Sequence, residues 1–68
     1  MDAKLIRYVS ESFDLNTGRK VIVEVYEYGD SRDYVVVEIQ GVFRMKMSRG
    51  EWVQLGNIMN RVTERMGW

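Results

Sequence analysis

"VFRMKMSRGEW", residues 42–52, is the stretch in which the hydrophobic pattern of the chain changes its period. Up to residue 47, apolar side chains alternate with Arg44 and Lys46, as in a β-strand that buries one face. Ser48 followed by Glu51 is the capping-box pattern that satisfies two free backbone donors at a helix start. The stretch therefore predicts a strand running into a helix, with two cations on the strand face directed away from the core.

The segment that follows has helical periodicity, and we predict a helix over residues 49–65. Its apolar side chains recur at spacings of three and four and form one stripe, which we expect to cover the sheet. Gly56 lies beside this stripe and lowers helix propensity by about 1 kcal/mol relative to Ala. Close approach of a second helix would explain the glycine, and tolerance on an exposed face is the alternative. The stripe consists of Trp52, Leu55, Met59, Val62 and Met66.

Upstream of residue 42, three further segments alternate with period two, over residues 4–13, 19–28 and 34–40. Turn-forming segments separate them at residues 14–18 and 29–33, and Gly41 is expected to bend the chain into the last strand. The pattern predicts one α+β domain over residues 1–68, with a four-stranded antiparallel meander followed by one C-terminal helix.

The composition excludes several functional classes. The 68 residues contain no Cys and no His, so thiol chemistry, the usual zinc ligands and imidazole proton transfer are absent. Ten basic residues balance ten acidic ones, so net charge gives no hint of a polyanionic partner. The two acids of segment 29–33 lack the further ligands of a calcium loop, and we predict no metal and no cofactor. No long apolar segment occurs, and we expect a soluble intracellular protein without a membrane partner.

The face of the sheet opposite the helix is predicted to combine rings with cations. Tyr26, Tyr28 and Tyr34 fall on the same side as Arg44 and Lys46. Rings that stack on bases and cations that neutralise phosphates suit single-stranded nucleic acid. The first strand adds Arg7 or Tyr8, depending on its register, while Glu24 and Glu38 on this face would repel phosphate. A merely solvated face with cross-strand pairs is the alternative.

The size of the chain indicates self-association. A 68-residue domain encloses only a small core, and the helix carries more apolar surface than one small sheet buries. We therefore predict a homodimer. The residues expected at its interface are Trp52, Leu55, Gly56 and Met59.

Three segments resemble the positive cofactor four family of transcriptional coactivators: "IRYVS", "GRKVIVEVYEY" and "MKMSRGEWVQLGNIM". Their order and spacing extend the resemblance along nearly the whole chain. It implies a curved four-stranded sheet, a C-terminal helix, and a dimer built through helices and sheet edges. It also implies binding of unpaired or melted DNA in transcription, replication or repair, and leaves RNA binding open.

The resemblance also implies roles for individual residues. Arg7 stands where the family's arginine contacts the strand, and Phe13 falls near an aromatic that stacks on a base. Arg19 and Lys20 match basic residues that close the first hairpin. Tyr28 lies close to the position of the aromatic that ends the family's second strand, whereas Tyr26 replaces a basic residue expected two positions earlier. Gly41 precedes the basic cluster instead of following it. The nucleic-acid-binding set is therefore Arg7, Phe13, Arg19, Lys20, Tyr26, Tyr28, Arg44 and Lys46.

Structural roles are the alternatives for the same residues. Arg7 would pair with Glu11 or Glu24, and Phe13 would close the core beneath its hairpin. Tyr28 and Tyr34 would form a cross-strand pair. Trp52 is expected in the core or the dimer interface, and Trp68 either frays or packs on a partner.

We thus expect a homodimeric, largely sequence-independent single-stranded DNA-binding protein in the cytoplasm or nucleoid, or in the nucleus of a eukaryote. Its further partners would belong to the transcription or replication machinery. The alternative is a protein-interaction or assembly module whose sheet face is only solvated. An enzyme is the third class, and carboxylates such as Glu24 or Glu38 would then have to carry its acid–base chemistry.

Overall fold

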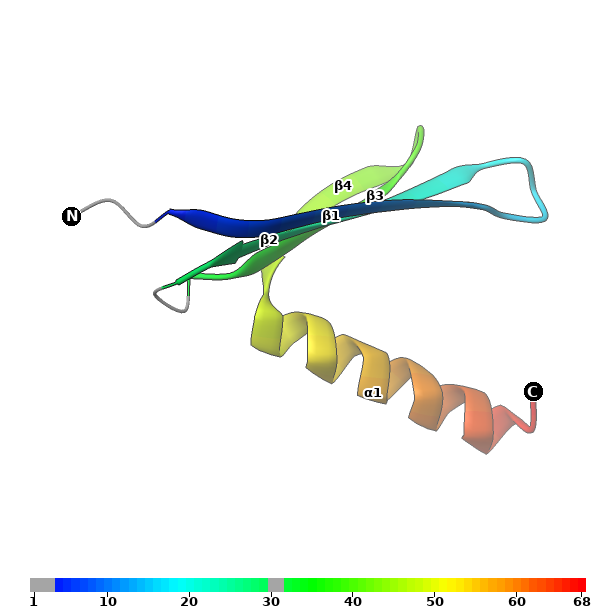
Figure 1. Cartoon of the computed structure of the whole chain (residues 1–68). Coiled ribbons are helices and arrows are strands. Elements are labelled where there is room, and N and C mark those ends of the chain that lie inside the picture. The colour runs from blue at the N-terminus through cyan, green and yellow to red at the C-terminus, as the bar shows by residue number, and fades with distance from the viewer. Residues whose placement is uncertain (1–3, 30–31) are drawn as a thin grey trace.

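The computed structural model describes residues 4–29 and 32–68 and has four antiparallel strands followed by one helix (Figure 1). The strands form one curved, open sheet in the order β1-β2-β3-β4. The predicted α+β meander is confirmed; positions 30 and 31 of the predicted turn 29–33 lie outside the described residues. The elements are β1 (Leu5–Asp14), β2 (Lys20–Tyr28), β3 (Tyr34–Ile39), β4 (Phe43–Ser48) and α1 (Arg49–Met66).

Two glycines set the tight connections between strands. Gly18 has φ +85° and donates its N–H to the carbonyl of Leu15 at 2.9 Å, which closes the turn between β1 and β2. Gly41 has φ +79° in the turn between β3 and β4, where Val42 donates its N–H to Ile39 at 2.9 Å. Side chains are rarely tolerated at such φ, so glycine fits both positions. The turn at residues 40–42 makes β3 one residue shorter than expected.

Cross-strand register divides the sheet into two faces. Val25, Val35 and Met47 lie opposite one another on β2, β3 and β4, so they point to the same side. Met47 lines a cleft together with side chains of α1, and we call this side the helix face. The neighbouring row is formed by Tyr26 and Tyr34, and its side chains point to the other side, which α1 leaves uncovered (Figure 1). We call that side the open face.

The helix begins and ends with standard caps. Ser48 Oγ accepts the N–H of Glu51 at 3.1 Å, and a carboxylate oxygen of Glu51 accepts the N–H of Ser48 at 2.9 Å. These hydrogen bonds hold the pKa of the Glu51 carboxyl below its usual value. Gly67 has φ +71° and donates its N–H to the carbonyl of Glu64 at 3.0 Å. The predicted capping box is confirmed, and the C-terminal end follows the glycine pattern of helix termini.

The expectation that the helical stripe covers the sheet is wrong for the single chain. Figure 1 shows α1 touching the sheet at its first turns and diverging from it toward the C-terminus. Side-chain exposure accordingly rises from 36% at Trp52 to 56% at Met66. Among the described residues the buried hydrophobic side chains are Val35, Val36 and Met47; Val35 and Met47 lie on the helix face, where β3 and β4 meet the start of α1, and Val36 lies on the open face.

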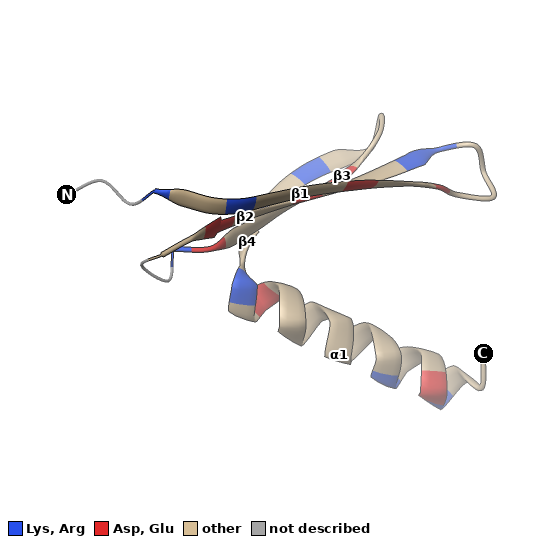
Figure 2. Cartoon of the chain, viewed as in Figure 1, with Lys and Arg blue, Asp and Glu red and all other residues tan. Residues whose placement is uncertain are grey.

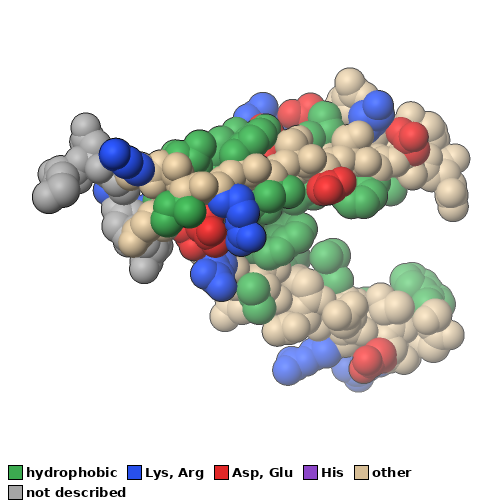
Figure 3. All heavy atoms as spheres, in the orientation of Figure 1, with side chains coloured by type: hydrophobic (Ala, Val, Ile, Leu, Met, Phe, Trp, Pro, Cys, Tyr) green, Lys and Arg blue, Asp and Glu red, His purple; other side chains and the backbone are tan. Residues whose placement is uncertain are grey.

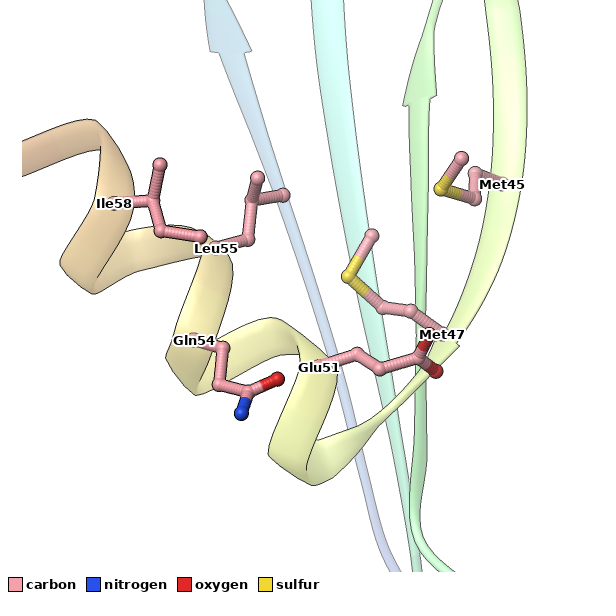
Figure 4. A pocket seen from close by; sticks show the side chains of 6 residues that line it. All are labelled: Met45, Met47, Glu51, Gln54, Leu55 and Ile58. Atoms are coloured by element: carbon pink, nitrogen blue, oxygen red, sulfur yellow. The ribbon is translucent and has the colours of Figure 1, made fainter. Parts of the chain in front are cut away.

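An apolar cleft remains between the sheet and the helix (Figures 3 and 4). Its volume is about 270 Å³, and Figure 4 shows Leu55 and Ile58 of α1 facing Met45 and Met47 of β4. Apart from its adjacent residues and the backbone of its own helical turns, no atom of the described residues lies within 4 Å of where a Cβ of Gly56 would stand. The residues predicted at a dimer interface therefore border open space in the single chain. No helix in the described part of the chain combines the length and the apolar character needed to span a membrane.

Candidate nucleic-acid interface on the open face

A row of aromatic rings crosses the open face from one edge of the sheet to its middle. Tyr8, Tyr26 and Tyr34 are directly opposed on β1, β2 and β3. The rings of Tyr26 and Tyr34 stack with centroids 4.6 Å apart and planes 15° apart, while Tyr8 and Tyr26 are 5.0 Å apart and tilted by 57°. Tyr28 stacks more loosely on Tyr34, at 6.2 Å. These separations match favourable aromatic pairs.

Lys46 of β4 completes the row. Its ammonium lies 4.2 Å from the centroid of the Tyr34 ring, within the range of a cation–π interaction. Because Tyr34 has the lysine on one side and Tyr26 on the other, its ring is held by both neighbours. The same two tyrosines, with Val36, Arg44 and Lys46, line a shallow hollow of about 360 Å³ on the open face.

Glu24 organises the hydroxyls of this row. One of its carboxylate oxygens accepts hydrogen bonds from Tyr8 at 2.8 Å and from Tyr26 at 3.0 Å. These bonds, with the nearby charge of Arg44, hold the pKa of Glu24 below its usual value, and the bond to Glu24 raises the pKa of Tyr26 to about 12. At neutral pH the carboxyl is therefore ionised and Tyr26 remains a donor, which fixes the direction of the hydrogen bonds.

Arg44 is shared between two carboxylates. Its guanidinium lies 3.5 Å from Glu38 on the neighbouring strand β3 and 3.8 Å from Glu24 on β2, one strand further. The arginine side chain remains 61% exposed, so water and ions reach it. The predicted conflict between cations and acids on this face thus takes the form of ion pairs, and a phosphate would have to compete with two carboxylates for Arg44.

Several of the residues proposed from the sequence share the open face. Tyr26, Tyr28, Arg44 and Lys46 lie together there. Lys20 lies toward the far end of the same face, opposite Asp14. Arg19 lies in the loop between β1 and β2, where its carbonyl accepts the N–H of Leu15 at 2.8 Å.

Arg7 lies on the opposite side of the sheet. From Asp14 back to Arg7 the first two strands pair in one continuous register, which places Arg7 opposite Glu27 and Tyr8 opposite Tyr26; the irregularity lies beyond Arg7, at Leu5. The Arg7 guanidinium forms an ion pair with Glu27 at 3.1 Å, and it lines a small cavity with Trp52 and Val53 of α1. The alternative prediction that Arg7 forms an ion pair is confirmed, but the predicted partners are wrong, because the acid is Glu27 and not Glu11 or Glu24. On the open face, β1 contributes Tyr8 instead.

Phe13 also lies on the helix face, opposite Val21, and is 56% exposed. The single chain therefore neither groups it with the tyrosines nor buries it beneath its hairpin. The sequence suggested either a base-stacking ring among the binding residues or a ring that closes the core beneath its hairpin. The position of Phe13 in the single chain agrees with neither.

Sequence reasoning missed two structural residues. The Asp33 side chain, 12% exposed, accepts the Tyr28 N–H at 2.9 Å and pairs with Arg49 at 3.5 Å, which joins the β2–β3 connection to the start of α1. Val36 is 6% exposed although it lies on the open face, because surrounding rings and cations cover it. Two features of the sequence could have indicated these residues. Asp33 lies in a predicted turn, and Val36 belongs to a run of four apolar residues, 34–37.

No family model, curated protein or solved structure matches the chain. The resemblance to the positive cofactor four family therefore stays a prediction that rests on the three sequence segments quoted above.

Proposed function

We propose that the chain is a homodimeric protein that binds single-stranded DNA through its open face with little sequence preference. The observation that carries the proposal is the row of Tyr8, Tyr26 and Tyr34, which ends at Lys46 and adjoins Arg44 on a face without helix cover. Rings offer stacking to any base, and exposed cations attract the backbone. Such a ligand would place the protein inside the cell, in transcription, replication or repair, as the family resemblance also implies.

Self-association is supported by the surface of the single chain. Its accessible surface is 5848 Å², whereas a compact protein of this mass exposes about 4,500 Å². The radius of gyration is 14.3 Å, against about 11 Å for a compact domain of this length. The surplus of about 1,300 Å² exceeds the roughly 800 Å² that each partner buries in a standard interface.

Exposed apolar side chains of β4 and α1 contribute to this surplus, and Met45 and Ile58 among them line the cleft between the two elements. Met45 and Phe43 on β4 are 53% and 44% exposed, and Ile58 and Met59 on α1 are 54% and 53% exposed. Between residues 52 and 60 the helix carries no charge, as Figure 2 makes visible. A second copy brings an equally uncharged helix, so we take the occupant of the cleft to be α1 of a partner chain.

A titration of a fluorescent 20-nucleotide oligothymidine by fluorescence polarisation tests the binding proposal. Two exposed cations per chain give four per dimer, so the logarithm of the binding constant should fall with the logarithm of salt concentration with a slope of about −3. Arg44→Ala combined with Lys46→Ala should flatten that slope, whereas Arg61→Ala on the helix should leave it unchanged. Arg7→Ala tests the contact that the family resemblance implies. Because Arg7 lies on the helix face, we expect this substitution to change the binding constant little.

The absence of saturable binding below tens of micromolar would refute the proposal for DNA, and the same titration with oligouridine tests RNA. The alternative, a protein-interaction module, is favoured by one observation: the ion pairs of Arg44 with Glu24 and Glu38 already neutralise its charge. No retention of the protein on single-stranded DNA resin, with a stable dimer in solution, would support that alternative.

A further inference from the structure

The two ends of the aromatic row on the open face differ: a lysine covers the last ring at one end, and the last ring at the other end has no such neighbour among the described residues. Each inner ring has a neighbour on both sides: Tyr26 lies between Tyr8 and Tyr34, and Tyr34 lies between Tyr26 and the Lys46 ammonium. A base cannot stack on either inner ring without displacing one of these neighbours. The row therefore offers stacking at its end and not along its length.

Tyr8 is the ring at the end without the lysine. It belongs to β1, which is an edge strand, and its ring is 49% exposed. Tyr26 is the aromatic neighbour of this ring on the β2 side, and within residues 4–29 and 32–68 no second aromatic ring pairs with it. The hydroxyl is anchored on Glu24 at 2.8 Å, so the ring is held in place before any ligand arrives. Holding the ring in advance reduces the entropy cost of stacking on it.

We propose that the outer face of Tyr8 stacks on an unpaired base of the bound strand. The inference rests on the proposed function and names the residue that recognises the bases. Rings in the row are spaced by 4.6 Å and 5.0 Å, close to the roughly 4.8 Å between neighbouring strands. A base stacked on Tyr8 thus takes the place that the ring of one more strand would occupy beyond β1.

The inference differs from what the sequence resemblance implies. The family's first-hairpin aromatic falls near Phe13, which in this chain lies on the helix face and is separated from the row by the sheet. Tyr8 instead shares Glu24 with Arg44, whose guanidinium is 3.8 Å from that carboxylate. The stacking ring and an exposed cation thus contact the same carboxylate, and rings combined with cations on one face suit an unpaired strand.

Matched oligonucleotides and variants test this proposal. We compare a 20-nucleotide oligothymidine with an oligonucleotide of equal length and charge whose central residues are abasic. Tyr8→Leu keeps apolar bulk without a ring, Tyr8→Phe keeps the ring without the hydroxyl, and Tyr8→Ala removes both. Ser12→Ala, on the same strand and face opposite Ile22, is the control for changes at this edge.

We expect Tyr8→Leu and Tyr8→Ala to weaken oligothymidine binding by about 5- to 150-fold. Binding of the abasic oligonucleotide should change little, because its phosphates are still contacted. Tyr8→Phe should stay within about threefold of the unaltered protein, as should Ser12→Ala. Circular dichroism and thermal melting establish that each variant is folded, and Tyr8→Leu carries the test if Tyr8→Ala is not.

Unchanged oligothymidine affinity in Tyr8→Leu would overturn the inference, and so would an equal loss on both oligonucleotides, since that indicates a structural role. In both cases the unaltered protein still binds with its salt dependence, and the proposed function stands. If the unaltered protein binds neither oligonucleotide, the proposed function fails and this inference fails with it.

Discussion

At the scale of single residues, Glu24 and Glu38 decide how much of the positive charge of the open face is available. Both carboxylates contact Arg44, and Glu24 also accepts the hydroxyls of Tyr8 and Tyr26. Glu24 therefore contacts both the aromatic row and the arginine, whereas among the described residues Glu38 pairs with Arg44 alone. The two acids have separable effects on a bound strand.

We expect Glu38→Gln to strengthen oligothymidine binding by about two- to fivefold at low salt, because it releases Arg44 from one exposed ion pair. The polarisation titration used above measures this change, and the salt slope should become steeper. Glu64→Gln, which removes the same charge from the helix, is the control and should raise affinity less. Weaker binding by Glu38→Gln would mean that Arg44 is positioned by Glu38 for its contact.

At the scale of elements, hydrogen bonds and an ion pair hold the start of α1 against the sheet, whereas the remainder of the helix has few contacts with its own chain. The capping box joins Ser48 to Glu51, and the ion pair of Arg49 with Asp33 links the same turn to the β2–β3 connection. Beyond Leu55 the helix has few neighbours in its own chain, and α1 contacts only β3 and β4 of the described sheet. The C-terminal half of the helix is therefore the element that we propose packs against a partner chain.

Gly56 provides a test of that packing. In the single chain an added Cβ would meet no atom within 4 Å, and Ala would improve helix propensity by about 1 kcal/mol. We nevertheless expect Gly56→Ala to weaken the dimer, because a partner helix approaching this position would meet the new methyl group. Analytical ultracentrifugation measures the dimer dissociation constant. A higher melting temperature with an unchanged dissociation constant would indicate that no helix approaches Gly56.

At the scale of the whole molecule, the proportions of the chain fit one half of an assembly. The chain extends over 48 × 26 × 16 Å, and its apolar cleft opens between sheet and helix (Figure 3). A monomer with these proportions exposes many of its large hydrophobic side chains to water, and a domain of this size has only a small core to offset that exposure. Dimerisation would bury them without any change in the elements.

Sedimentation equilibrium at low micromolar concentration should give about twice the chain mass of 8.1 kDa. Leu55→Glu, which places a charge in the cleft, should raise the dimer dissociation constant by about a hundredfold or more. Asn57→Glu introduces the same charge on the opposite side of α1 and should leave the dimer intact. A chain mass of one copy for the unaltered protein would refute dimerisation, and equal effects of both variants would point to an interface elsewhere on the helix.

Much of the fold follows from local patterns in the sequence. Alternation of apolar and polar residues indicated the strands, and Ser48 with Glu51 indicated where the helix begins, because periodicity and capping depend on neighbouring residues only. For the same reason, the position of Arg44 and Lys46 opposite the apolar side of β4 could be predicted. These features need no knowledge of which strands pair.

Only the tertiary structure decided which residues of β1 share a face with the tyrosines. The pairing register that β1 and β2 keep from Asp14 to Arg7 puts Arg7 on the helix face and Tyr8 on the open face. A shift of one residue exchanges the two faces of a strand, and the alternation of β1 is compatible with either choice. The divergence of α1 from the sheet was equally beyond the sequence, because an apolar stripe indicates that a helix is covered but does not say by which chain.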